Sequence, residues 1–271
     1  RGLGDVYKRQ QLDRPAEMPW DIFGVDIVID STGKFRDREF MQAHLDNGAP
    51  RVLLRTLPTD HIDRIVIPGI NGAEAEPADR MISAGSATTS ALCLLLDSLS
   101  GRFDIECGSM TTVHAFTSDQ ALQDYAGSDF RRSRSAAKNI IPNTHEASLW
   151  MGRILPEFDG KILTSALNVP VQEGCLLDVT LVMEDSEVTV EEVNGHFAAA
   201  ASDELRDVLG YETRPLVSVD YVNDPRSAIV DALSTMVVDH TQVKIYAWYD
   251  NEWGYVNRMM DIIEKVALSG F

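Results

Sequence analysis

The sequence predicts an α/β protein in which part of a parallel sheet is followed by a second domain with a mixed or largely antiparallel sheet. Before residue 86, strand and helix patterns alternate at the spacing of βαβ units, and such units build parallel sheets. Beyond that point long connections separate the strands, which favours mixed or antiparallel pairing. The length of 271 residues, 44% of them hydrophobic, is enough for one large domain or two medium-sized ones.

The first half begins with an apolar run at residues 20–30, which predicts a buried strand that closes in the turn at residues 31–33. A helix is expected at residues 37–45, ended by Asn47 and Gly48. Further strands are expected at residues 51–54, at residues 65–70 and in the stretch that ends at Ser83.

The turn at residues 83–90 joins that last strand to a helix expected at residues 91–99. Small residues allow a tight turn, and the hydroxyls of Thr88 and Thr89 are expected to cap the helix. A strand-to-helix turn of this kind presents its apex to a ligand at the positive end of the helix. The apex residue is Ala87, whose methyl group carries no chemistry.

The second half contains a capping-box pattern at residues 189–192, which predicts a helix that continues to about residue 201. A final amphipathic helix is expected to end near residue 266. Strands are expected at residues 110–116, 162–169, 176–184 and 243–249.

Composition excludes several classes of function. The net charge of −18 leaves no basic face for nucleic acid. No apolar run is long enough to span a bilayer, so we expect no membrane partner. The three cysteines, Cys93, Cys107 and Cys175, form no CxxC pair, so neither a disulfide framework nor a metal site is expected, and we expect a reducing, cytoplasmic location. Residues 1–10 are basic and aperiodic, and we interpret them as a non-native tail.

Four stretches together resemble the glyceraldehyde-3-phosphate dehydrogenase family. They are VDIVIDSTG (25–33), TTVHAFTSDQ (111–120), DFRRSRSAAKNIIP (129–142) and VKIYAWYDNEWGYVNR (243–258). The resemblance covers residues 11–271 and implies a partial Rossmann-type sheet in the C-terminal part of an NAD-binding domain (11–86). It also implies a catalytic and oligomerisation domain (87–250), a C-terminal helix (251–271) that returns to the first domain, and a homotetramer. No GxGxxG motif is present, so we expect a fragment that lacks the adenine side of the cofactor site.

The same resemblance implies contacts to the nicotinamide side of NAD or NADP. Ser31, Thr32 and Gly33 occupy the family's strand-end loop along the cofactor, and Asn251 stands where the family holds the carboxamide. Tyr255 matches a neighbouring aromatic residue.

Members of the resembled family oxidise an aldehyde through a cysteine thiolate that a histidine activates. The histidine matches His114, which follows Ala87 by the family's 27 positions. Ala87 itself stands in the place of the cysteine. Ser86 and Thr88 flank it, but an alcohol is a much weaker nucleophile than a thiol, and Cys93 is expected in the core.

The positions that bind phosphate in the resembled family are altered as well. Asn168 stands where the family has an arginine, and His145 and Glu146 replace part of a Thr-Gly loop, whereas Thr117 is retained. Ser86 and Thr88 complete the predicted substrate and anion site. Glu173 adds a nearby acid, and Arg55 adds a cation whose direction the sequence leaves open. A phosphorylated aldehyde is therefore expected to be a poor substrate.

Three hypotheses follow from these residues. The first is a family homologue that keeps a nicotinamide pocket without phosphorylating chemistry and acts in binding or regulation. The second is a dehydrogenase of changed chemistry that uses His114 as a general base on a neutral or cationic substrate. The third is an ordinary member of the family.

Overall fold

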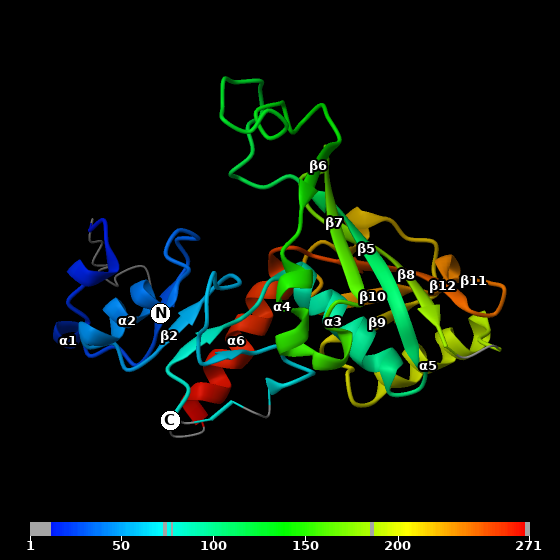
Figure 1. Cartoon of the computed structure of the whole chain (residues 1–271), viewed down its shortest axis with the longest axis horizontal. Helices are drawn as coiled ribbons and strands as arrows, with labels where there is room; N and C mark the ends of the chain where they lie inside the picture. The colour runs from blue at the N-terminus through cyan, green and yellow to red at the C-terminus, as the bar shows by residue number, and fades with distance from the viewer. Residues whose placement is uncertain (1–11, 73–74, 77, 185–186, 269–271) are drawn as a thin grey trace.

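A computed structural model describes residues 12–72, 75–76, 78–184 and 187–268. The chain forms a small sheet and a large sheet with helices packed against both (Figure 1). This arrangement confirms the predicted fold class. The predicted tail at residues 1–10 lies outside the described residues.

The small sheet is parallel throughout, with the strand order β1-β2-β4-β3. Apolar residues fill its middle strands, as expected for a sheet covered on both faces. Helix α2 (Arg38–Asp46) joins the first two strands and is capped by Asp37, whose carboxylate accepts from the Phe40 amide at 3.0 Å. The strands are β1 (Val28–Asp30), β2 (Val52–Leu54), β3 (Arg64–Ile65) and β4 (Met81–Ser83).

The predicted strand at residues 20–30 was wrong in its first part. Residues Trp20–Phe23 form the short helix α1, and only Val28–Asp30 is extended. Gly24 ends α1 in the left-handed conformation, with φ of +57°, and so interrupts the apolar run.

The large sheet is mixed and has the order β6-β7-β5-β8-β12-β10-β9, with β11 paired to β12. Parallel pairing joins β5 to β7 and β9 to β10, whereas the other neighbours are antiparallel. The strands are β5 (Ile105–Ala115), β6 (Ile141–Thr144), β7 (Ile162–Val169), β8 (Cys175–Met183), β9 (Leu209–Glu212), β10 (Ala228–Asp231), β11 (Met236–Val238) and β12 (Gln242–Tyr249).

The helices bury the apolar surface of both sheets. Helix α3 is buried along almost its whole length in the core beneath the large sheet (Figure 1). Tyr255, Met259 and Ile262 of the last helix pack against Leu53 and Ile82 of the small sheet. The remaining helices are α3 (Ala87–Ser100), α4 (Ala147–Ile154), α5 (Val190–Ser202) and α6 (Trp253–Leu268), with 3-10 turns η1 (Pro15–Glu17), η3 (Pro156–Phe158), η4 (Ser218–Tyr221) and η5 (Ala232–Ser234).

The connection from β5 to β6 extends away from both sheets, as the green loop of Figure 1 shows. It exposes large apolar side chains, of which Phe130 is 88% exposed. In the described part of the chain, no helix combines the length and the apolar character needed to cross a membrane.

Candidate active site

Helix α3 begins at Ala87, four residues earlier than the sequence suggested. Ser86 is its N-cap, because the Ser86 hydroxyl accepts from the Thr89 amide at 3.1 Å. The prediction that Thr88 and Thr89 cap the helix was therefore wrong. Before the cap, Gly85 has φ of +71°, and a Cβ there would lie 2.7 Å from the Ile67 side chain.

Ala87 lies at the junction of the two halves of the molecule. Its half-buried side chain packs against both apolar clusters, the one around the large sheet and the one between α6 and the small sheet. The first turn of α3 therefore presents a methyl group at the boundary between the sheets.

Thr88 points into the protein and takes part in a buried hydroxyl network. The hydroxyl of Tyr249, a residue 1% exposed, lies 2.7 Å from the Thr88 hydroxyl and 2.8 Å from that of Thr112 on β5. Burial raises the pKa of Tyr249 well above its usual value. The network links α3 to β5. It engages the Thr88 hydroxyl, which was predicted to belong to the substrate and anion site.

Tyr249→Phe is expected to lower the free energy of unfolding by about 2 kcal/mol, because the hydroxyls of Thr88 and Thr112 lose their shared partner in a dry site. Urea denaturation measures the change. The control is Tyr246→Phe on the same strand, whose half-buried ring should tolerate the change within about 0.5 kcal/mol. An equal effect of both variants would contradict the network.

His114 stands near the end of β5 with its imidazole fixed by the backbone. Nδ1 lies 2.6 Å from the carbonyl oxygen of Ala115 and donates to it, because a carbonyl only accepts. Nε2 therefore carries the free lone pair. Burial lowers the pKa of His114, an effect opposed by the Ala115 bond and by Asp119. Near pH 7 the ring is a neutral base.

Asn168 on β7 is paired in register with His114. Its side-chain nitrogen, Nδ2, donates to the same Ala115 carbonyl at 3.4 Å. Its side-chain oxygen, Oδ1, accepts from Nδ2 of Asn143 at 3.2 Å. The side chain is 7% exposed. Asn168 therefore braces the backbone that orients His114 and carries no charge for a phosphate.

His145 follows β6 and is held by the start of α4. Its Nδ1 accepts from the Ala147 amide at 3.1 Å, so the ring proton of the neutral form is on Nε2. Burial, and next the charge of His114, lower the pKa of His145 to about 4, an effect that Glu146 opposes. Next to it, Glu146 forms an ion pair with Arg36, from the loop between β1 and α2.

The half-buried imidazole of His145 makes stability depend on pH. The folded pKa of about 4 is below the usual value of 6.5, so between these limits the unfolded chain binds more protons. Stability is expected to be full above pH 6.5 and to fall by up to about 1.4 kcal/mol per pH unit toward pH 4. Urea denaturation measures the free energy of unfolding of the unsubstituted protein and of His145→Asn across this pH range. The variant keeps an acceptor for the Ala147 amide but does not titrate. If the free energy of unfolding changed with pH equally in the two proteins, His145 would not be the group responsible.

Thr117, predicted to contact an anion, is hydrogen-bonded to an acidic side chain of the protein instead. Its hydroxyl donates to the carboxylate of Asp119, which also pairs with Arg132. The Thr117 hydroxyl and the Arg132 guanidinium are thus both bound to one carboxylate.

The loop at residues 31–33 lies at the carboxyl end of β1, where ligands bind in parallel sheets. Thr32 is fixed by Asp30, whose Oδ1 accepts from the Thr32 amide at 2.9 Å and from its hydroxyl at 2.6 Å. Ser31 is exposed, and Gly33 has φ of +69°. The structure directs Arg55 toward this loop, since its guanidinium lies 4.0 Å from the place of a Cβ on Gly33.

Asn251 lies between β12 and α6, beside a buried thiol. The Cys175 thiol donates to Asn251 Oδ1 at 3.4 Å and accepts from the Ala115 amide at 3.3 Å. Within the part of the chain that the structure describes, no hydrogen bond occupies the amide nitrogen of Asn251. A carboxamide group of a ligand fits such a donor.

Tyr255, predicted to lie beside the cofactor, is 8% exposed and braces the strand-end loops. Its hydroxyl contacts the carbonyl oxygens of Arg55 and Gly85, the latter at 3.3 Å. The residue holds together the loops after β2 and β4. Its part in cofactor binding stays a prediction.

The thiols of the chain lie away from Ala87 or are inert. Cys93 is fully buried in the core, as predicted, and burial raises its pKa. Cys175 is 1% exposed, and burial raises its pKa to about 12. Cys107 is exposed but sits at the opposite end of β5 from His114. None of the three supplies a thiolate to the site.

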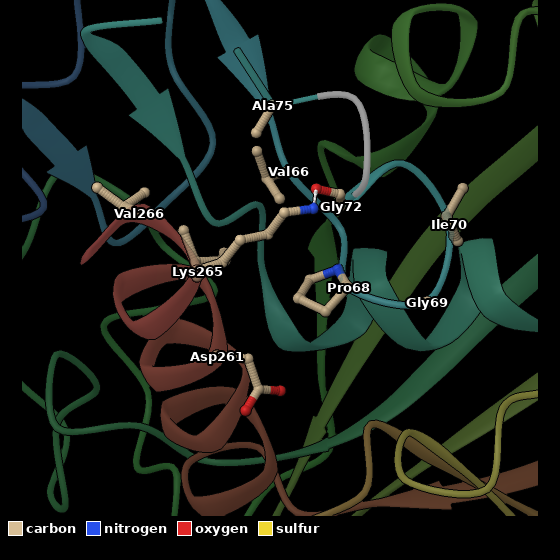
Figure 2. A pocket seen from close by; sticks show the side chains of 10 residues that line it. Val66, Pro68, Gly69, Ile70, Gly72, Ala75, Asp261, Lys265 and Val266 are labelled. Atoms are coloured by element: carbon tan, nitrogen blue, oxygen red, sulfur yellow. Dashed lines mark hydrogen bonds between the residues drawn. The ribbon is translucent and has the colours of Figure 1, made fainter. Parts of the chain in front are cut away.

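A separate hollow of about 360 Å³ lies between α6 and the residues after β3 (Figure 2). Its lining is mostly apolar, and the Lys265 ammonium reaches across it to the carbonyl oxygen of Gly72. Neither His114 nor Ala87 lines it. The chemistry proposed for these two residues therefore lies outside this hollow.

Comparison with known proteins identifies the family of the chain. Residues 86–251 match the family model described as glyceraldehyde 3-phosphate dehydrogenase, C-terminal domain. Glyceraldehyde-3-phosphate dehydrogenase 1 of Bacillus cereus is 39% identical over 257 residues, which cover 94% of this chain and 76% of that protein. A Mycobacterium bovis glyceraldehyde-3-phosphate dehydrogenase is 41% identical over 255 residues, covering 94% and 74%. A plasmid-encoded glyceraldehyde-3-phosphate dehydrogenase of Cupriavidus necator is 42% identical over 264 residues, covering 97% and 78%.

Proposed function

The chain belongs to the glyceraldehyde-3-phosphate dehydrogenase family of oxidoreductases, and from that premise we propose that it binds NAD or NADP without phosphorylating chemistry. The observation that carries the proposal is the methyl group of Ala87 at the start of α3, where the family reaction needs a thiolate. The buried thiols of Cys93 and Cys175 do not replace it, because their raised pKa values keep them protonated.

The residues present fit the nicotinamide side of a dinucleotide. Asn251 offers an amide nitrogen to the carboxamide, and residues 31–33 line the carboxyl end of β1. When bound, the dinucleotide would supply or accept a hydride at its nicotinamide ring. The chain's own contribution is to orient that ring and to supply a neutral base, His114, whose Nε2 keeps a free lone pair.

The charge around the site argues against a phosphorylated substrate. Glu146 and Asp119 place carboxylates where an anion would bind, and each is already paired with an arginine. Asn168 is occupied by the Ala115 carbonyl. A further carboxylate about 5 Å from a phosphate costs on the order of 3 kcal/mol per charge pair at an effective dielectric constant of 20.

A second candidate is hydride transfer without a covalent intermediate, and the free lone pair on Nε2 of His114 favours it. A neutral imidazole at that position is suited to take the proton of a substrate hydroxyl. His114→Asn keeps a donor for the Ala115 carbonyl but removes the base, so it should abolish such activity, whereas Ala87→Gly should spare it.

The proposed function is tested by calorimetric titration of NAD and NADP, with Asn251→Ala as the variant that removes the carboxamide contact. Because only the nicotinamide side of the site is proposed here, we expect binding at about millimolar cofactor that weakens about tenfold in the variant. Glyceraldehyde 3-phosphate and inorganic phosphate should give no NADH. Turnover of glyceraldehyde 3-phosphate, or no binding at millimolar cofactor, would overturn the proposal.

We also propose a homotetramer in which the loop between β5 and β6 packs against another copy. Its exposed apolar residues, among them Phe130 and Ile140, support this proposal. Light scattering gives the test, and a monomer at micromolar concentration would contradict it.

A further inference from the structure

We propose that Arg55, together with the amide of Gly33, binds the phosphate on the nicotinamide side of a dinucleotide. The proposal rests on the proposed function, because it adds a contact to the same ligand. It gives a role to a cation whose direction the sequence left open. The phosphate belongs to the dinucleotide and not to the substrate, whose own phosphate the carboxylates of Asp119 and Glu146 disfavour.

Arg55 directly follows β2, and its backbone is held from two sides. Its amide donates to the carbonyl oxygen of Asp30, at the end of β1, at 3.0 Å. Its own carbonyl oxygen accepts from the hydroxyl of Tyr255 on α6. The side chain, in contrast, is exposed. The main chain therefore fixes Arg55 at the carboxyl edge of the parallel sheet, where ligands of such sheets bind.

The guanidinium of Arg55 lies beside the backbone of Gly33. Its Nη2 is 4.0 Å from the place that a Cβ would take on Gly33. Gly33 has φ of +69°, a conformation that side chains rarely adopt, and the next residue, Lys34, is exposed. Two cationic residues thus flank Gly33, one along the chain and one across the sheet.

The donors at this loop have no partner within the chain. Among the residues that the structure describes, neither the guanidinium of Arg55, the ammonium of Lys34 nor the amide of Gly33 forms a hydrogen bond or an ion pair. Arg36, two residues beyond Lys34, is by contrast paired with Glu146. A guanidinium presents its N–H groups as a planar fork that fits phosphate oxygens. Unpaired cations in a chain of net charge −18 therefore favour an anionic ligand here.

The carboxylate of Asp30, at the end of β1, is occupied by other groups. Asp30 is 4% exposed, and its Oδ1 accepts from the amide of Thr32 at 2.9 Å and from its hydroxyl at 2.6 Å. Its Oδ2 lies 3.4 Å from Nε2 of His44. The carboxylate is therefore turned into the protein, and the exposed side of the loop carries Arg55 and Lys34.

The position of Arg55 relative to Asn251 indicates which phosphate it meets. Asn251 is the proposed contact of the carboxamide, and Tyr255 follows it by four residues. The hydroxyl of Tyr255 contacts the carbonyl oxygens of Gly85 and Arg55, so these loops lie beside the start of α6. In a nicotinamide dinucleotide the ribose and then its phosphate follow the ring. A ring held by Asn251 would therefore direct its own phosphate toward Arg55.

Calorimetric titration of inorganic pyrophosphate into this chain tests the anion site without a nicotinamide ring. We expect a Kd of about 1 mM that weakens about tenfold in Arg55→Gln, because charge-assisted hydrogen bonds are lost. Arg55→Lys keeps the charge but not the fork and should recover part of the affinity.

The matched control is Arg206→Gln, which removes the same charge from a side chain that is 71% exposed between α5 and β9. Its affinity for pyrophosphate should stay within about twofold of that of the unsubstituted protein. Equal losses in Arg206→Gln and Arg55→Gln would show an effect of net charge alone and would contradict the inference.

Nicotinamide mononucleotide combines the two proposed contacts in one probe. It should bind more weakly in both Arg55→Gln and Asn251→Ala, whereas pyrophosphate should respond to Arg55→Gln only. Pyrophosphate that does not bind, or that binds Arg55→Gln as tightly as the unsubstituted protein, would overturn the inference. Mononucleotide binding that depends on Arg55 but not on Asn251 would support the inference and count against the proposed function, so the two failures are distinct.

Discussion

Ala87→Cys is expected to give a thiol that iodoacetamide modifies at pH 7 at least about 10³-fold faster than Cys175. The position is the first residue of α3, where free amide groups and the helix dipole stabilise a thiolate. An ordinary thiol with a pKa of about 8.5 is a few per cent ionised at pH 7. With a pKa of about 12, Cys175 is about 0.001% ionised and is also buried.

A time course of alkylation, followed by peptide mass spectrometry, measures this difference. The matched control is Ala91→Cys, one turn further along the same helix, where the side chain is fully buried and should resist modification. If the thiol at position 87 reacts as slowly as Cys175, the start of α3 is neither accessible to the reagent nor able to stabilise a thiolate.

Asp250→Ala is expected to lower the free energy of unfolding by about 3 kcal/mol, because it removes a buried charged acceptor from three backbone donors. The carboxylate, 1% exposed, accepts from the amides of Glu252 and Trp253 at 2.8 and 2.7 Å. Its other oxygen accepts from the Asn223 amide at 2.8 Å. The residue therefore both caps α6 and fixes Asn251, which follows it.

Asp250→Asn separates the contacts to Glu252 and Trp253 from the contact to Asn223, because each set uses a different carboxylate oxygen. Its single amide oxygen retains the contacts to Glu252 and Trp253, so the expected loss is about half as large. Urea denaturation gives both values. A change below about 1 kcal/mol in the alanine variant would show that α6 is held by its apolar face alone.

Local sequence patterns predicted much of the fold. The strand at residues 162–169 and the capping box at Thr189 are confirmed, because alternation and capping act between residues close in the chain. The parallel sheet follows from the spacing of its βαβ units. The candidate site was found from the separation of Ala87 and His114 within the family resemblance.

The remaining features depend on partners far apart in the sequence. Arg36 and Glu146 form their ion pair across 110 residues, and no local pattern indicates it. Thr88 was expected to cap a helix, but Tyr249, 161 residues away, takes its hydroxyl, and Ser86 caps instead. Strand β6 was missed because it is short and contains Pro142, so its pattern was too weak to predict it.

The absence of a nucleophile near α3 is tested most directly with acetyl phosphate, because acyl transfer to a thiolate needs no dinucleotide. Intact protein is incubated at pH 7 and analysed by mass spectrometry before and after hydroxylamine, which removes esters and thioesters but leaves lysine amides. We predict no hydroxylamine-labile acetyl group at residues 86–88 of the unsubstituted protein and one at position 87 of Ala87→Cys. A labile acetyl group at residues 86–88 of the unsubstituted protein would contradict the account, because Ser86 or Thr88 would then serve as the nucleophile.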